Sequence, residues 1–270
     1  MERIALVLGV TGGIGGAVAR RLVERGWSVR ALVRAHSAHR VPQGVSAVIG
    51  DAMDGAAVAA AARGATVIVH AVNPPGYRNW NTVVLPMLDN SIAAARVSGA
   101  QVLLPGTVYN YGPDSLPLID ETAPQHAVTR KGAIRVEMER RLRAAADAGK
   151  IRALIVRAGD FFGPGAANSW FAQGLITPGG RPRVIRNPAA RGLGIYGGIF
   201  PTWPKPWSAW WSMIGCRPLP TITWVGTGTE RAPRWSRPLS RRWARRRCGL
   251  RRSRGGRCAW LPRLPTCRAN

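Results

Sequence analysis

The sequence predicts an α/β fold in which helices cover both faces of a doubly wound parallel sheet, followed by an irregular, disordered basic tail. Three observations lead to this prediction. Short apolar runs alternate with longer segments of helical periodicity through the first 190 residues. A glycine-rich turn follows the first apolar run, and the composition changes abruptly near residue 190.

The predicted strands are short apolar runs bounded by turn-forming or polar residues. They span residues 3–8, 27–34, 45–49, 66–71, 101–104 and 151–157. The predicted helices between them span residues 17–25, 55–63, 82–97 and 134–148. Because crossovers between parallel strands are right-handed, this alternation winds helices onto both faces of the sheet. Ligands of such sheets bind beyond the carboxyl ends of the strands, so the residues after each strand are the candidates for a site.

The first of these turns carries glycines in the spacing GxxGxxG, at Gly9, Gly12 and Gly15. One glycine allows a sharp turn, one lets the backbone approach a pyrophosphate, and one lets the helix pack on the strand. Free amides and the positive end of the helix dipole then favour phosphate. A strand before the glycines and a helix after them are the context that this motif needs. The sequence therefore predicts a Rossmann-type site for NAD or NADP.

Residues after the later strands complete the predicted cofactor site. Arg34 stands where an NAD site often carries an acid. It suits either a pairing with the 2′-phosphate, which would favour NADP over NAD, or a solvated position at the end of the strand. Asp51 suits either a contact to the adenine amine or a simple turn. The full set of predicted cofactor residues is Gly9, Thr11, Gly12, Gly13, Ile14, Gly15, Arg34, Asp51, Ala52 and Ala71.

Four segments resemble the extended short-chain dehydrogenase/reductases, the group that contains the NAD-dependent epimerases and dehydratases. They are TGGIGG at 11–16, GDAMD at 50–54, VIVHA at 67–71 and RAGDFFGPG at 157–165. The resemblance covers about residues 2–190. It implies a Rossmann domain with a small C-terminal substrate lobe. It also implies bound NAD(P) and oxidation or reduction of a nucleotide sugar or a related small molecule.

The same resemblance implies a catalytic set of Ser or Thr, Tyr, and a Lys four residues after the Tyr. Thr107 falls at the Ser/Thr position, but the helix that follows carries Lys131 at the tyrosine position and Arg135 at the lysine position. An arginine cannot release a proton near neutral pH, although it can hold a ribose hydroxyl. Lys131 could release one only if it were buried beside Arg135. Tyr109 and Tyr111 are alternative proton donors, and Lys131 and Arg135 could equally form a solvated helix face.

Residues 191–270 form the predicted tail, which shows neither strand nor helix periodicity. It holds 17 of the 39 Lys and Arg residues, one of the 13 acids (Glu230), eight of the 11 tryptophans and all four cysteines. The cysteines lack CxxC pairs and histidine partners, which argues against a metal site. The arginine run at 241–257 could contact nucleic acid phosphates, but its aromatics are not spaced for stacking on bases.

The composition of this tail indicates a frameshift. Read from the third base of each codon, residues 200–211 (FPTWPKPWSAWW) allow PDLAETMVRLV, an amphipathic helical pattern. Each TGG codon for Trp then contributes to Leu, Met or Val, which explains the excess of tryptophan. The sequence thus predicts an NAD(P)-binding domain over residues 1–190 and a tail over 191–270 that lacks a native substrate lobe.

Three functions remain open. The first is an NAD(P)-dependent oxidoreductase, epimerase or dehydratase acting on a small molecule. The second is a non-catalytic NAD(P) sensor, and the third is the inactive product of a frameshifted gene. No apolar run of about 18 residues and no signal peptide are found, so no membrane span and a cytoplasmic location are expected. No nucleic acid partner and no metal are expected, and the oligomeric state is left open, with a homodimer as one option.

Overall fold

The computed structural model describes residues 3–74, 79–115, 119, 121–162, 197–199 and 221–224. These residues all lie in the first of two compact units of the chain, Met1–Thr227. The four cysteines and the arginine run of the tail lie outside the described residues.

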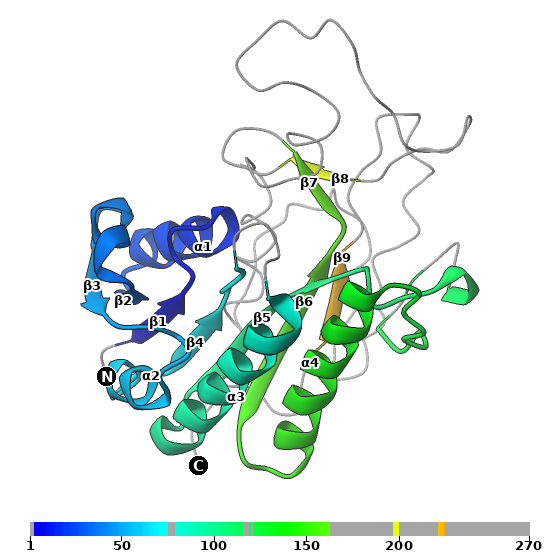
Figure 1. The fold of residues 1–270 in the computed structure, drawn as a ribbon. Helices are drawn as coiled ribbons and strands as arrows, with labels where there is room; N and C mark the ends of the chain where they lie inside the picture. Colours follow the sequence, from blue (N-terminus) through cyan, green and yellow to red (C-terminus); the bar gives the residue numbers. More distant parts are fainter. Residues whose placement is uncertain are drawn as a thin grey trace, which may run out of the picture. The chain divides into compact units, whose positions relative to one another are not determined.

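A parallel sheet forms the centre of this unit, with the strand order β3-β2-β1-β4-β5-β6-β9 (Figure 1). Its strands are β1 (Ile4–Leu8), β2 (Ser28–Val33), β3 (Val45–Ile49), β4 (Val67–His70), β5 (Gln101–Thr107), β6 (Arg152–Ala158) and β9 (Thr221–Trp224). A second pair, β7 (Asp160–Phe162) and β8 (Gly197–Ile199), is also parallel. From β1 the chain adds strands first on one side and then, starting with β4, on the other. The strand order therefore reverses beside β1, and ligands of doubly wound sheets bind at this switch point.

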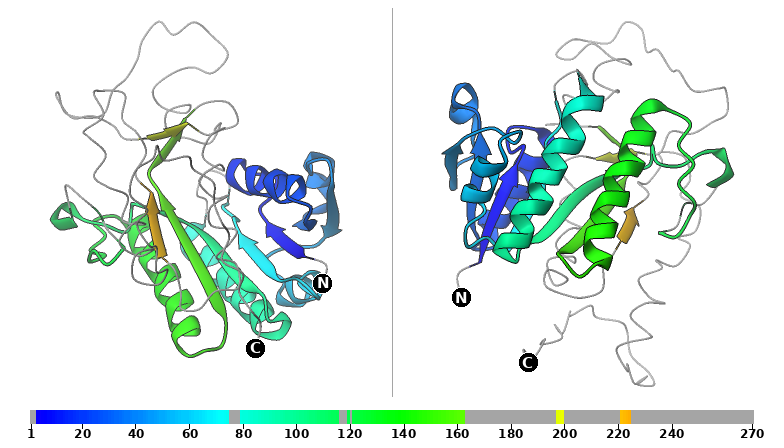
Figure 2. Two further views of the ribbon diagram at one scale, coloured as in Figure 1. Left: turned by 180° about the vertical axis from the view of Figure 1, so that it is seen from behind. Right: turned by 60° about the horizontal axis from the view of Figure 1, so that its bottom comes forward.

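Helices cover both faces of the sheet, as predicted (Figures 1 and 2). They are α1 (Gly13–Glu24), α2 (Gly55–Ala61), α3 (Trp80–Ser98) and α4 (Arg130–Asp147), with two 3₁₀ turns, η1 (Ala35–Arg40) and η3 (Pro113–Ser115). Alternate residues of β1 supply the two cores: Val7 packs with Leu22 of α1, while Leu6 packs with Leu88 of α3 and Leu142 of α4. Because successive strand side chains point to opposite faces, one central strand is buried on both sides.

Two helices begin four residues earlier than predicted. α1 begins at Gly13 rather than at residue 17, and α4 begins at Arg130 rather than at residue 134. The first turn of each contains glycine, which lowers intrinsic helix propensity and hides the start of the helix in the sequence. At α4 the start is fixed instead by Thr129, whose hydroxyl accepts a hydrogen bond from the amide of Gly132 at 3.0 Å.

Two short segments after residue 190, where the sequence shows no strand periodicity, are strands: β8 and β9. β9 pairs with β6 in parallel, with Ile155 opposite Thr221 and Ala158 opposite Trp224. Its residues, Thr-Ile-Thr-Trp, are β-branched or aromatic and so fit a pleated surface. Four residues are too few for periodicity to stand out within a region rich in proline and arginine.

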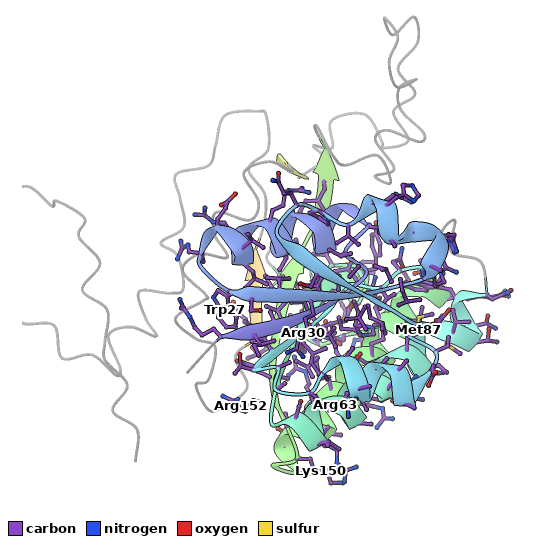
Figure 3. All side chains as sticks on the ribbon, turned by 90° about the vertical axis from the view of Figure 1, so that its left-hand side faces the viewer. Trp27, Arg30, Arg63, Met87, Lys150 and Arg152 are labelled. Carbon is purple, nitrogen blue, oxygen red and sulfur yellow. The ribbon has the colours of Figure 1, made fainter. Side chains whose placement is uncertain are left out.

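Cations collect at the end of the sheet where the strands begin, away from the glycine-rich turn. Figure 3 labels Arg30, the third residue of β2, and Arg152, the first residue of β6, and each donates to a backbone carbonyl: Arg30 to Arg63 at 2.7 Å and Arg152 to Gly99 at 3.0 Å. These arginines stabilise the ends of helices and loops, whose last carbonyls otherwise lack partners. Within the described part of the chain, no helix combines the length and the apolar character that crossing a bilayer requires.

Candidate cofactor and catalytic site

The glycine-rich turn between β1 and α1 is fixed by two close backbone contacts. Gly9 has a φ of +86°, and a Cβ atom there would lie 2.4 Å from the carbonyl oxygen of Ala71, just after β4. A Cβ atom on Gly15 would lie 2.2 Å from the carbonyl oxygen of Gly9. Only glycine fits these two positions, since real Cβ atoms do not approach so closely. The turn, the start of α1 and the end of β4 are therefore packed together.

Gly12 is less crowded than these two glycines, although a Cβ atom there would still make one tight contact. Its φ of −85° is ordinary, and the nearest atom to a Cβ there is the carbonyl oxygen of Gly9, at 3.3 Å. Gly12 caps α1 without a side-chain hydrogen bond, so the amides of Gly13, Ile14 and Gly15 in the first turn have no side-chain cap. These amides and the helix dipole favour an anion such as a pyrophosphate. This cradle fits the phosphates of a dinucleotide.

An arginine that the sequence did not single out contacts the glycine-rich turn from outside it. Arg40, the last residue of η1, donates from Nη2 to the carbonyl oxygen of Thr11 at 3.3 Å. Arg34, which was predicted to contact the cofactor, is exposed at the end of β2 and precedes η1. The 3₁₀ turn between them brings Arg40 to the glycines, a contact that sequence spacing alone does not reveal.

Asp51 and Ala52 follow β3 and have contacts within the fold. The Asp51 carboxylate accepts from the amide of Met53 at 2.9 Å, which is the turn role foreseen for it. The carbonyl of Ala52 accepts from the side chain of Asn90 at 2.9 Å. A contact between these two residues and an adenine ring stays a prediction.

The end of β5 meets the start of α4, and this junction brings the predicted catalytic residues together. Thr107 is the last residue of β5, and its hydroxyl accepts from the amide of Tyr109 at 3.3 Å. A Cβ atom on Gly132 would lie 2.2 Å from the carbonyl oxygen of Tyr109. Gly132 thus lets α4 approach the strand end, and its neighbour Lys131 lies exposed at the same junction.

Tyr109 and Tyr111 have different environments. The side chain of Tyr109 is 44% exposed, whereas Tyr111 is 7% exposed. The guanidinium of Arg157 lies 5.5 Å from the centre of the Tyr111 ring. The ring of Tyr111 is therefore part of the packed interior, and Tyr109 is the phenol that a substrate could reach.

Arg135 lies one turn further along α4, half-buried against α3. Its guanidinium stacks over the ring of Trp80 at 5.0 Å, and Trp80 donates from Nε1 to the Asn73 side chain at 2.8 Å. A cation over an aromatic face is held electrostatically by the ring. Arg135 stands at the family's lysine position. Through Trp80, its positive charge is thus fixed near Asn73, which follows β4.

His70 ends β4 beneath this charge and is buried. Its Nδ1 lies 2.8 Å from the hydroxyl of Ser91. Burial, together with the smaller effect of the nearby Arg135 charge, lowers the pKa of His70 from 6.5 to about 3. His70 is therefore neutral at physiological pH, which suits a structural contact rather than proton transfer.

Because His70 is neutral in the folded protein, we expect the stability of the fold to decrease at acidic pH. Between pH 6.5 and 3 the unfolded chain binds a proton on this histidine that the folded chain does not, so its contribution to stability is present above pH 6.5 and lost as the pH falls. At pH 5 the free energy of unfolding should be about 2 kcal/mol lower than above pH 6.5, because each pH unit below 6.5 costs about 1.36 kcal/mol. Urea unfolding at pH 7.5 and pH 5 measures it. His70→Gln should remove this part of the pH dependence, and an unchanged slope in that variant would contradict the assignment.

A buried ion pair joins α4 to β6 behind the site. Arg157 is 0% exposed and Glu139 is 2% exposed, and Arg157 donates from Nε to Glu139 at 2.9 Å. Gln125 donates to the same carboxylate at 2.8 Å and accepts from the side chain of Asn110 at 3.2 Å. This network links the segment after β5, the loop before α4 and α4 itself, so it holds the junction that carries Thr107.

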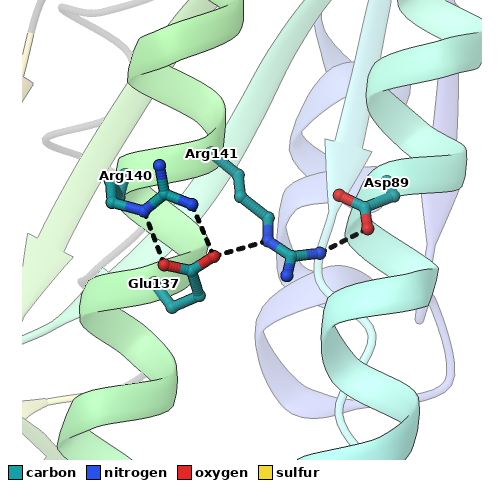
Figure 4. Close-up of polar contacts among 4 residues, drawn as sticks. All are labelled: Asp89, Glu137, Arg140 and Arg141. Carbon is teal, nitrogen blue, oxygen red and sulfur yellow. Dashed lines mark hydrogen bonds and ion pairs between the residues drawn. The ribbon is translucent and has the colours of Figure 1, made fainter.

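A second, surface network joins α4 to α3 (Figure 4). Glu137 accepts from Arg140 at 2.6 Å and from Arg141 at 2.7 Å, and Arg141 also pairs with Asp89 of α3. The hydrogen bonds from Arg140 and then Arg141 lower the pKa of Glu137 to about 2. Solvent screens these pairs, so removing one partner should cost less stability here than at the buried pair.

The strand order and the glycine turn define a dinucleotide-binding Rossmann domain. Residues 5–180 match the NAD dependent epimerase/dehydratase family, and the chain belongs to that family. The resemblance inferred from the four sequence segments is thereby confirmed, together with the predicted fold class.

One curated relative is a reductase that matches part of the chain. The chain is 31% identical over 180 residues to the 3-diazoavenalumate denitrifying reductase of a Streptomyces species. This match covers 59% of this chain and 57% of that protein. The chain thus spans little more than half the length of this curated relative.

Solved structures of UDP-glucose 4-epimerases share the fold. The Thermus thermophilus enzyme, solved with NAD, aligns at a TM-score of 0.63 and 19% identity over 83% of this chain and 78% of that one. The Brucella ovis enzyme, also solved with NAD, aligns at 0.53 and 19% identity over 60% and 53%.

Proposed function

We propose that this protein binds NAD(P) on the glycine-rich turn and uses it to oxidise or reduce a small molecule, such as a nucleotide sugar, in the cytoplasm. The observation that carries the proposal is the packing of Gly9 and Gly15, which leaves the first-turn amides of α1 open at the switch point of the sheet. NAD(P), when bound, supplies or accepts the hydride. The reductase and epimerase activities named for the relatives belong to the same broad chemistry.

Tyr109 is the proton donor that the geometry favours. Its phenol is the exposed one of the two candidates and follows Thr107 by two residues. In a reduction, Tyr109 would give its proton to the substrate oxygen, and Thr107 would donate a hydrogen bond to that oxygen and orient it. Water would then return a proton to the phenol.

Lys131 and Arg135 supply positive charge rather than protons in this proposal. Lys131 is exposed, so burial does not turn it into an acid of the kind considered from the sequence. Lys131 precedes Gly132, which packs against the Tyr109 carbonyl, so its charge is available to a negatively charged ligand at this junction. Arg135 carries five N–H donors and is held over Trp80, which suits a hydrogen bond to a ribose hydroxyl of the cofactor.

Substitutions at the strand end test this catalytic assignment. With UDP-glucose as the first substrate, Thr107→Ala and Tyr109→Phe should each lower kcat/KM by about 100-fold or more, the range of general acid catalysis. Both should leave NAD(P)H binding, measured by fluorescence, unchanged. Tyr111→Phe is the matched control, because that ring is buried, and it should keep most of the activity. Activity that survives in Tyr109→Phe places the proton donor elsewhere.

A second candidate function is a non-catalytic NAD(P) sensor, favoured by the absence of a Tyr-x-x-x-Lys sequence. It predicts cofactor binding without turnover of any substrate. A third reading is that the tail from about residue 190 comes from a shifted reading frame and that the protein is inactive. The charge and tryptophan imbalance of that region supports it, and β9 in the sheet argues against it. The DNA encoding residues 185–215 decides this point, since a stop codon in the shifted frame excludes the frameshift.

A further inference from the structure

The amino end of the sheet, where its strands begin, is rich in cations. The paired strands of this sheet run parallel, so the connections that lead from α1, α2, α3 and α4 into the next strand all lie at that end. Figure 3 labels Arg30, Arg63, Lys150 and Arg152, which belong to this set. Seven cations stand in or beside these connections and the segment before β1, and we call them the amino-end face: Arg3, Arg25, Arg30, Arg63, Arg96, Lys150 and Arg152.

Four of these cations are held in place by backbone carbonyls at the ends of helices. Such carbonyls lack partners inside the helix, so an arginine there stabilises the fold. Each guanidinium has five N–H donors, and a carbonyl takes one of them. The other donors stay available, and the charge is already in position before a ligand arrives. The four contacts are Arg3 to Arg25 at 3.3 Å, Arg30 to Arg63 at 2.7 Å, Arg63 to Ala60 at 3.4 Å and Arg152 to Gly99 at 3.0 Å.

The charge of the amino-end face is not neutralised by the fold. Within the described ranges, none of its seven cations forms an ion pair with a carboxylate, whereas the arginines at the surface of α4 do. The acids beside the same connections are Glu2, Glu24 and Asp147, and Glu24 is paired with Arg21 of α1 at 2.6 Å. Unpaired cations on one face raise the local positive potential, which attracts a polyanion.

The scarcity of apolar side chains on this face selects among polyanions. Of the exposed large hydrophobic residues in the described part of the chain, Val97 alone stands beside the amino-end face. A peripheral helix on a membrane needs apolar side chains that enter the lipid, and a protein interface needs buried aromatic or aliphatic anchors. A single-stranded nucleic acid is bound largely by aromatic side chains that stack on its bases. The phosphate backbone of a duplex requires cations alone.

The width of the face suits a duplex. Its cations extend from β2 to β6, which are the ends of a row of five adjacent strands, β2-β1-β4-β5-β6. At about 4.8 Å between neighbouring strands, this row is about 19 Å wide. The major groove of B-DNA is about 12 Å wide, so the face can reach the phosphates on both sides of a groove.

We propose that the amino-end face binds the phosphate backbone of double-stranded nucleic acid without reading its sequence. The face lies at the opposite end of the sheet from the candidate cofactor site, so this binding does not depend on the proposed enzymatic function. The sequence did not predict a nucleic acid partner for this domain. The seven cations come from five separate segments of the chain, and the fold alone brings them to one face.

Salt-dependent binding to the full chain tests the proposal. The triple variant Arg25→Gln, Arg96→Gln and Lys150→Gln removes three exposed cations that take no part in the four carbonyl contacts. Fluorescence anisotropy measures the affinity for two labelled duplexes of different sequence between 50 and 200 mM salt. The unchanged protein should bind both duplexes equally, with log K falling linearly with log salt. The triple variant should lower the magnitude of that slope by about 3, since each phosphate contact contributes about 1.

A second triple variant, Arg20→Gln, Arg34→Gln and Arg130→Gln, is the matched control. It also removes three exposed cations and keeps the arginines of residues 241–257, so the two variants have the same net charge. Its slope should change by less than about 1. No binding of either duplex at 50 mM salt, or equal slopes for the two variants, overturns the proposal. Vesicles containing phosphatidylserine are the further probe: if the first variant loses binding to vesicles but keeps its affinity for duplexes, the partner is a membrane and the proposal is wrong.

Discussion

Replacing Glu139 with alanine is expected to lower the free energy of unfolding by about 3–5 kcal/mol, the loss typical when one member of a buried ion pair is removed. Glu139→Ala would leave the guanidinium of Arg157, which is 0% exposed, without its carboxylate. Gln125 would lose its acceptor as well. Urea unfolding followed by circular dichroism measures the change. Because the pair holds α4 against β6, any activity should fall together with stability.

Glu137→Ala is the control on the same helix. Glu137 also binds two arginines, but its pairs lie at the surface (Figure 4), where such contacts are worth about 0–1 kcal/mol. A double variant, Glu139→Met with Arg157→Met, should regain much of the loss, since apolar residues can replace a buried pair. Equal effects of Glu139→Ala and Glu137→Ala would contradict the larger cost expected at the buried pair.

Gly12→Val is expected to weaken NAD(P)H binding by at least about tenfold, because a charge-assisted hydrogen bond to phosphate is worth roughly 1.5–3 kcal/mol. The valine would project from the capping residue of α1, where the pyrophosphate is proposed to lie. The melting temperature of the protein without cofactor should fall less than in Gly15→Ala, since Gly12 has an ordinary φ and its Cβ would lie 3.3 Å, not 2.2 Å, from the Gly9 carbonyl oxygen. Fluorescence titration and thermal unfolding separate the two effects.

Gly15→Ala provides the contrast. Its Cβ would lie 2.2 Å from the Gly9 carbonyl oxygen, so this smaller change should destabilise the fold itself. Binding by Gly12→Val as tight as that of the unchanged protein would remove the pyrophosphate from the start of α1.

The sequence predicted the features that depend on local pattern. Apolar runs located six strands of the sheet, and the glycine spacing located the turn, because buried parallel strands and tight turns impose their residue types directly. The four helices were found as well, although the starts of α1 and α4 were hidden by glycines in their first turns.

The features that were missed depend on contacts between distant residues. Nothing in the sequence distinguishes Glu139, which is buried against Arg157, from Glu137, which lies two residues earlier at the surface. Arg40 lies 29 residues from Thr11, and Arg135 meets Trp80 of another helix. From the sequence alone, a charged residue in a helical pattern is expected to be solvated. Only the position of the neighbouring helix or strand shows that it is buried.

The contact between Gly9 and Ala71 also sets the order in which the protein can become functional during synthesis. The glycine-rich turn takes its shape from the backbone that follows β4, more than 60 residues further along the chain. The first strand, turn and helix leave the ribosome long before that support exists, since domains emerge from the N-terminus onward. A nascent chain therefore cannot use a dinucleotide to guide its earliest folding. The cofactor can stabilise the domain only after β4 has been inserted beside β1.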